Sequence, residues 1–167
     1  MYNVDDHVFH HSEGLCRVVE IREMHRPNGE LATYYILSPL YSALDTTVMV
    51  PLRSAEALLR DPLSKAEADV MIKQIEDLAP LELSQKEIRT LQTLFELSSL
   101  DHSEIIRVIK GLIIREHKLA ENRKSLPITQ KRVLRSAEKL IYDQLAVALS
   151  LTRDEVEEKV YALILEK

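Results

Sequence analysis

Apolar and polar residues alternate in short runs over the first 52 positions of the chain, which is the pattern of β-strands. Strands rich in β-branched and aromatic residues are predicted at positions 7–9, 15–21, 33–37 and 46–50. Pro27-Asn28-Gly29 lies between the second and third strands and has the residue types of a tight turn, which indicates a hairpin. Short strands joined by such turns favour a small antiparallel barrel or curled sheet.

After Pro51 the apolar residues recur at the spacing of helices. Four predicted helix starts carry a capping box. In this motif the cap side chain accepts the backbone N–H of a Glu three residues later, and the side chain of that Glu accepts the backbone N–H of the cap residue. The pairs are Ser64 and Glu67, Ser84 and Glu87, Asp101 and Glu104, and Thr152 and Glu155. A further helix is predicted from about Ile128 to Leu149, and a short helical turn at 54–59. The expected fold is α+β, with a β-barrel-like module at 1–52, a linker at 53–63 and an all-helical bundle at 64–167.

The net charge of −5 would ordinarily argue against a nucleic-acid partner, but the charges are unevenly distributed. Positions 107–139 hold ten Lys and Arg residues against three Glu residues, a net charge of +7. The rest of the chain holds twelve basic and twenty-four acidic residues, a net charge of −12. A segregated basic segment is typical of a surface that faces nucleic-acid phosphates.

Helical geometry places these charges opposite the predicted core. At 100° per residue, the apolar and basic residues of each helix fall on opposite faces. In the first helix the core residues are Ile105, Val108, Ile109 and Leu112, and the basic residues are Arg107, Lys110, Arg115 and Lys118. In the second, the core residues are Val133, Leu134, Ala137, Leu140, Ile141, Leu145 and Ala148. Two helices joined by a short turn are expected to pack antiparallel, which would merge their basic faces.

We therefore predict a surface that contacts DNA phosphates. Its residues are Arg107, Lys110, Arg123, Lys124, Lys131, Arg132, Arg135 and Lys139. The alternative is that these are ordinary solvated helix faces, although such faces usually mix both signs of charge.

The chain shows little that indicates catalysis. The residues His7, His10, His11, Glu13 and Cys16 lie within ten positions and raise the possibility of a metal site or a thiol nucleophile. On a strand, however, the adjacent His10 and His11 point to opposite faces, and no second Cys or His pair supports them. Glycine occurs only at positions 14, 29 and 111, which disfavours a phosphate-binding loop. We expect a non-enzymatic protein without metal or cofactor, and a metal-dependent or thiol enzyme is the less favoured alternative.

The remaining bulk features concern location and binding. A single cysteine is consistent with a reducing compartment, and the sequence contains neither a signal-peptide pattern nor an apolar run long enough to span a bilayer, so a cytoplasmic protein without membrane contact is expected. The strand at 46–50 is either an edge strand, which offers unpaired backbone groups to another protein, or an internal strand of the sheet.

Particular residues then suggest a family. The β module contains the runs at 8–14 (Val-Phe-His-His-Ser-Glu-Gly), 49–52 (Met-Val-Pro-Leu) and 54–56 (Ser-Ala-Glu). The helical part contains 108–112 (Val-Ile-Lys-Gly-Leu), 126–134 with Lys131-Arg132, and 145–149 (Leu-Ala-Val-Ala-Leu). In order and spacing this arrangement resembles the CarD/CdnL family of bacterial transcription regulators over nearly the whole chain.

The resemblance implies a Tudor-like (SH3-like) N-terminal module that docks on the β-subunit of RNA polymerase by sheet-to-sheet pairing. The residues expected to bind polymerase are Arg22, Thr47, Val48 and Met49. The resemblance also implies a helical domain that contacts promoter DNA at the upstream edge of the transcription bubble, where a family tryptophan wedges into the minor groove. That position falls near Leu83 or Ser84, so Leu83 is the expected apolar wedge.

The chain departs from the family pattern at three places. The usual Tyr-Pro-x-His-Gly of the first turn is His10-His11-Ser12-Glu13-Gly14, the arginine of the polymerase-binding strand is Met49, and Gln85-Lys86-Glu87 replaces the basic residues after the wedge. We predict a transcription regulator that binds the polymerase β-subunit and contacts promoter DNA without sequence specificity. The alternative is a protein-interaction adapter without direct DNA contact, and the oligomeric state is left open.

Overall fold

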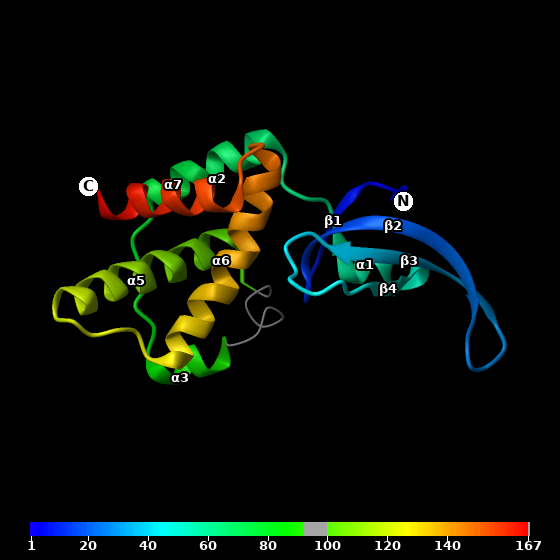
Figure 1. Ribbon diagram of the computed structural model, residues 1–167, viewed down its shortest axis with the longest axis horizontal. Coiled ribbons are helices and arrows are strands. Elements are labelled where there is room, and N and C mark those ends of the chain that lie inside the picture. The colour runs from blue at the N-terminus through cyan, green and yellow to red at the C-terminus, as the bar shows by residue number, and fades with distance from the viewer. Residues whose placement is uncertain (92–99, 167) are drawn as a thin grey trace. The chain divides into compact units, whose positions relative to one another are not determined.

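The computed structural model describes residues 1–91 and 100–166 and divides the chain into two compact units, Met1–Pro62 and Leu63–Lys167 (Figure 1). The first unit is built on an antiparallel sheet and the second is helical, which confirms the α+β class.

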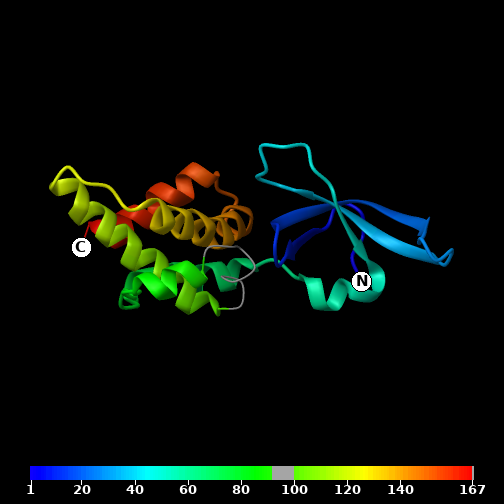
Figure 2. The same cartoon turned by 90° about the horizontal axis from the view of Figure 1, so that it is seen from below.

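The first unit contains five strands: β1 (His7–His10), β2 (Gly14–His25), β3 (Leu31–Pro39), β4 (Val48–Pro51) and β5 (Leu59–Arg60). Their order in the sheet is β4-β3-β2-β1-β5, and every neighbouring pair is antiparallel. The expected hairpin between β2 and β3 is confirmed, with Gly29 at φ +84° and its N–H donating to the carbonyl of Arg26 at 2.8 Å. Both strands extend beyond the predicted limits into a long curved hairpin (Figures 1 and 2), because cross-strand pairing continues from Arg22↔Tyr34 to His25↔Leu31.

The core of this unit lies on one face of the curled sheet. Its buried members are Val8, Cys16, Val18, Tyr35, Leu37, Val50 and Leu59. A 3-10 turn at Leu52–Ser54 and the helix α1 (Ala55–Leu58) pack against this cluster through Leu52, Ala55 and Leu58. Most of the residues predicted as a linker at 53–63 thus lie in regular elements of the first unit. Burial of Leu59 and pairing of β5 with β1 place these residues in the first unit, which ends at Pro62.

The second unit contains α2 (Lys65–Asp77), α3 (Gln85–Thr90), α5 (His102–Glu121), α6 (Ile128–Ala148) and α7 (Arg153–Leu165) among its described elements. All four predicted capping boxes are present, at the starts of α2, α3, α5 and α7. The helix α6 instead follows Pro127, which makes no side-chain cap. No described helix is long and apolar enough to cross a membrane.

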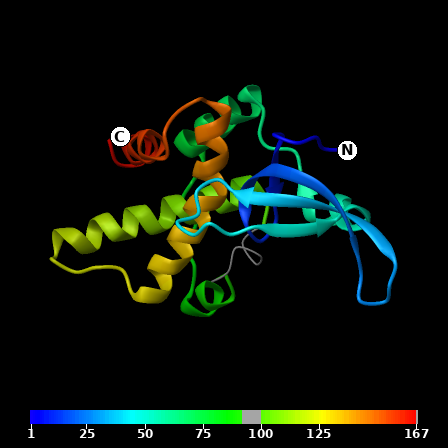
Figure 3. The ribbon, with the colours of Figure 1, turned by 45° about the vertical axis from the view of Figure 1, so that its right-hand side comes forward.

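The apolar stripes of α5 and α6 form the centre of the helical core. All the predicted core residues of these two helices are buried except Ala148, which is half-buried. The two helices run in opposite senses but cross obliquely (Figures 1 and 3), so their outer faces diverge along their lengths. α7 contributes Val156, Val160 and Ile164, and α2 contributes Ala68, Met71 and Ile75.

Candidate protein-docking edge and nucleic-acid interface

The strand β4 is one of the two edges of the sheet. It pairs with β3 from Leu37↔Val48 to Tyr34↔Pro51, and no described strand pairs with its other side. The alternative left open by the sequence is thus resolved in favour of the edge. Such an edge presents backbone N–H and C=O groups to which another chain can add a strand.

Cross-strand register shows which side chains accompany this edge. Glu20, Ile36 and Met49 form one row across β2, β3 and β4, and Arg22, Tyr34 and Pro51 form the next row on the same face. Met49 is 54% exposed, although Ile36 beside it is buried. Val48 lies on the opposite face and packs against the core, whereas Thr47 is exposed and precedes the strand. We define the β4 docking surface as Arg22, Tyr34, Thr47 and Met49 together with the free edge of β4.

The position of Arg22 on this surface is held by Glu20. Its Nε donates to Glu20 Oε1 at 2.7 Å and its Nη2 donates to Oε2, a bidentate arrangement between residues two apart on one strand. The hydrogen bond from Arg22 lowers the pKa of the Glu20 carboxyl below its ordinary value. The guanidinium is half-exposed and lies two strands from the free edge, so it remains accessible to a partner.

The histidine-rich first turn has a local structural role. His10 is buried, and its Nδ1 accepts the backbone N–H groups of Ser12 and Glu13 at 3.3 and 3.2 Å. Burial lowers the pKa of the His10 imidazole, in agreement with a ring nitrogen that accepts hydrogen bonds. Cys16 is buried in the core, where its Sγ donates to the Gly14 carbonyl at 3.5 Å. Across residues 1–91 and 100–166, no group of three or more His, Cys, Asp or Glu side chains is arranged to hold a metal ion.

Most of the predicted phosphate-facing residues lie on the surface. Arg123 and Lys124 are exposed in the turn after α5, Lys131, Arg132 and Arg135 are exposed on α6, and Lys139 is half-buried. These six residues are called the basic helical face below. Glu138, an acid in the same stretch of sequence, is only 1% exposed and so does not offset their charge at the surface.

The structure corrects the predicted position of Lys110. The helical projection places it on the outer face of α5, but it is 8% exposed, and its Nζ donates to the carbonyls of Ile75 and Glu76 at 2.9 Å each. These carbonyls belong to the last turn of α2, where a cation is favourable because the helix dipole is negative there. The burial of Lys110 could have been suspected from the sequence, since Ile106 and Ile113 share its helix face at helical spacing. Both isoleucines are buried in the structure.

Arg107 and Gly111 complete a structural motif around Lys110. Arg107 Nε donates to the Ala79 carbonyl at 3.0 Å, and the Arg107 carbonyl accepts the N–H of Leu81 at 2.9 Å. A Cβ added to Gly111 would lie 2.1 Å from the Leu81 carbonyl oxygen, so only glycine allows this approach. We call Arg107, Lys110 and Gly111 the α5 anchor, because together they hold the segment that follows α2 against α5. Arg107, although half-exposed, therefore has at least in part a structural role.

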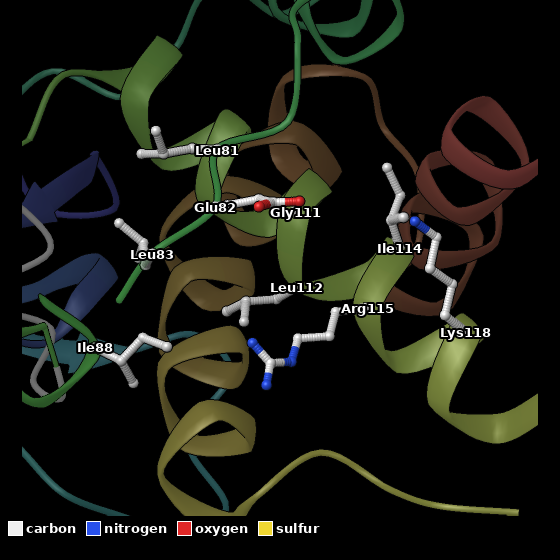
Figure 4. Close-up of a pocket in the computed structure, with 9 residues that line it drawn as sticks. All are labelled: Leu81, Glu82, Leu83, Ile88, Gly111, Leu112, Ile114, Arg115 and Lys118. Atoms are coloured by element: carbon white, nitrogen blue, oxygen red, sulfur yellow. The ribbon is translucent and has the colours of Figure 1, made fainter. Parts of the chain in front are cut away.

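Leu83, the expected wedge, follows the anchored segment directly. It is half-buried and lines a cavity together with Ile88 of α3 and Leu112 of α5 (Figure 4). Its insertion into DNA stays a prediction.

A buried acidic cluster joins α5, α6 and α7 and was not anticipated from the sequence. The Tyr161 hydroxyl lies 3.4 Å from both Glu138 Oε1 and Glu116 Oε2. Burial, with the neighbouring Glu157, raises the pKa of Glu138 to about 7. One turn further along α6, Arg153 Nε donates to the buried Asp143 at 2.9 Å, and burial raises the pKa of Asp143 to about 6. Through these contacts the cluster links α5, α6 and α7.

Comparison with known proteins bears on the first unit. Residues 2–62 match the family model of the CarD-like/TRCF RID domain, a domain that interacts with RNA polymerase. The matched range coincides with the first compact unit, Met1–Pro62, and confirms the resemblance to CarD-like proteins for this part of the chain. No curated protein matches the chain significantly. The match supports a transcription-related, polymerase-binding role.

Proposed function

From the premise that residues 2–62 form a CarD-like/TRCF RID domain, we propose that this protein is a cytoplasmic transcription regulator that binds the β-subunit of RNA polymerase. In this proposal the first unit docks on polymerase, and the basic helical face of the second unit contacts promoter DNA without reading its sequence. The proposed protein has no catalytic activity and needs no metal or cofactor.

The observation that carries the proposal is the free β4 edge within the matched domain. Main-chain groups at a sheet edge supply affinity, and neighbouring side chains supply specificity, when a partner adds a strand. Met49 offers an exposed apolar contact next to the edge, and Arg22 offers a charged contact on the same face. The family's arginine at the Met49 position is replaced here, so the contact in this protein would be apolar rather than ionic.

The proposed docking is tested by measuring binding of the full-length chain to purified RNA polymerase and to its isolated β-subunit. Met49→Glu places a charge beside the free edge without entering the core, and is expected to weaken binding about ten-fold or more. Leu31→Glu is the matched control, since Leu31 is 57% exposed at the far end of the β2–β3 hairpin. Equal binding by the Met49→Glu variant and the wild type would exclude the β4 docking surface.

The proposed DNA contact rests on the exposed residues of the basic helical face. Lys131, Arg132 and Arg135 lie on one side of α6 and are all exposed. Each phosphate contact releases counterions, so affinity is expected to fall steeply with salt. Reversing all three charges should lower the affinity for a polymerase–promoter complex. It should also reduce the slope of log affinity against log salt by about one unit for each phosphate that is no longer neutralised.

A control variant distinguishes an effect of the basic helical face on affinity from an effect of net charge. Reversal of Lys65, Lys73 and Lys159 changes the net charge equally, at exposed positions on α2 and α7. The proposal requires that this control variant bind promoter complexes as the wild type does. If both triple variants lost affinity to the same extent, the effect would be one of overall charge.

The second candidate function is a protein adapter that binds polymerase or another partner without direct DNA contact. It is favoured by the α5 anchor, which removes the buried Lys110 from the predicted DNA surface and engages one nitrogen of the half-exposed Arg107. Polymerase binding accompanied by an unchanged promoter footprint, in wild type and triple variant alike, would select the adapter.

A further inference from the structure

The cavity beside the α5 anchor has the composition of a ligand site. It lies within the second unit and has a volume of about 290 Å³, at the lower end of the range for small-molecule pockets. Its apolar lining comes from the segment before α3, from α3 and from α5: Leu81, Leu83, Ile88, Leu112 and Ile114. Ile88 and Leu112 point toward each other in the close-up (Figure 4). These two residues are buried, whereas the other three are half-buried and so remain partly accessible.

The walls of this cavity are held in place before any ligand arrives. Leu81 is fixed by its hydrogen bond to the Arg107 carbonyl and by the close approach that Gly111 permits. At the other end of the segment, Ser84 forms a capping box with Glu87 at the start of α3. Both ends of the wall formed by residues 81–83 are therefore anchored. A preformed cavity avoids the entropy cost of ordering its walls on binding.

The charges at the margin indicate the sign of the ligand. Arg115 and Lys118, on successive turns of α5, line the cavity and are exposed, and neither forms an ion pair in the part of the chain that the structure describes. The Arg115 guanidinium lies next to Leu112 in Figure 4. Among the lining residues that the structure describes, Glu82 is the one acid. Two cations against one carboxylate favour a ligand with a single negative charge.

The residue types of the lining favour an aliphatic ligand over a nucleic-acid strand. Single-stranded nucleic acids are usually held by aromatic side chains on which bases stack. Within residues 1–91 and 100–166, no residue that lines the cavity is aromatic, and Glu82 would repel a chain of phosphates. The Arg115 guanidinium can instead form charge-assisted hydrogen bonds with a carboxylate, while an alkyl chain fills the aliphatic part.

We propose that this cavity binds a small aliphatic monocarboxylate, of the class of medium-chain fatty acids, with its alkyl chain against Leu83, Ile88 and Leu112 and its carboxylate on Arg115. Lys118, whose ammonium lies beside Ile114 in Figure 4, adds positive charge at the margin. The proposal goes beyond polymerase binding and does not depend on it, because the site lies wholly in the helical unit. None of its residues belongs to the β4 docking surface or the basic helical face.

The test uses the full-length protein with octanoate, and octanol as the uncharged ligand of equal chain length. Octanoate, well below its micelle concentration, is expected to bind one-to-one and to shift the amide resonances of residues 81–84 and 111–118. Its affinity should exceed that of octanol about ten-fold, because only octanoate gains charge-assisted hydrogen bonds. The Arg115→Gln and Lys118→Gln double variant should lose this difference and still bind both ligands weakly.

The matched control is the Arg123→Gln and Lys124→Gln double variant, which removes two exposed cations outside the cavity. It is expected to bind octanoate as the wild type does. The proposal is overturned if octanoate does not saturate, or if the Arg115 and Lys118 variant binds it unchanged. It is also overturned if a single-stranded oligonucleotide displaces octanoate, which would make the cavity part of a nucleic-acid surface.

Discussion

Replacing Glu138 by Gln is expected to stabilise the helical unit at alkaline pH. Glu138 is 1% exposed and lies between α5 and α7, where Glu116 and Glu157 add negative charge and Arg135 and Arg153 partly offset it. Burial is the largest cause of the raised pKa, so the folded protein favours the protonated carboxyl, in contact with the Tyr161 hydroxyl. Glutamine is uncharged at every pH and keeps the size and hydrogen-bonding capacity of that protonated form.

The magnitude follows from the difference in pKa between the two states. The folded value is about 7 and the ordinary value is 4.5, so the folded protein binds more protons than the unfolded chain between these limits. Stability due to the protonated carboxyl is therefore fully present below pH 4.5, decreases as pH rises and is lost above pH 7. At pH 8 the loss is about 3 kcal/mol, and at pH 5 it is below about 1 kcal/mol. Glu138→Gln avoids this loss.

The measurement is urea unfolding followed by circular dichroism at the helical minimum, at a series of pH values from 5 to 8. The free energy of unfolding of Glu138→Gln minus that of the wild type should grow with pH to about 3 kcal/mol. Glu158→Gln, at an exposed position on α7, is the control and should show no such growth. Subtracting the wild-type free energy of unfolding from that of Glu138→Gln at each pH removes the contribution of Asp143, which titrates alike in both proteins. A variant less stable than the wild type at pH 8 would refute the reasoning, since it would mean that an ionised Glu138 stabilises the fold through the arginines.

Two further predictions concern the α5 anchor, and both are measured by urea unfolding at neutral pH. Gly111→Ala is expected to destabilise the helical unit by about 1–3 kcal/mol, because its Cβ meets a backbone oxygen that cannot rotate away; an unchanged midpoint would show that the segment at Leu81 shifts freely. Lys110→Met keeps the aliphatic stem but removes both hydrogen bonds to the end of α2, and is expected to cost about 1–3 kcal/mol. Lys118→Met, on the same helix but exposed, should cost less than about 0.5 kcal/mol, and equal losses from the two lysines would contradict the anchoring role.

Local features of this protein were readable from the sequence alone. The four capping boxes involve residues three positions apart, and the Pro27-Asn28-Gly29 turn is equally short, so their chemistry needs no tertiary context. The apolar stripes of α5 and α6 are predictable for a related reason, since helical periodicity alone decides which residues share a face. The resemblance to CarD-like proteins was also present in the sequence, and the family match at 2–62 confirms it for the first unit.

Features that depend on distant neighbours were decided only by the tertiary structure. The edge position of β4 follows from the order of strands, which a strand's own residues do not specify. The helix projection puts Lys110 on the outer face, and the sequence counts Glu138 only as one acid of the basic segment. In the structure α2 covers Lys110, and α5 and α7 enclose Glu138. A helix projection shows one helix in isolation, whereas burial depends on how many neighbours pack against it. For the same reason the charge of the basic segment is read directly from the sequence, but only packing determined which of its cations reach the surface.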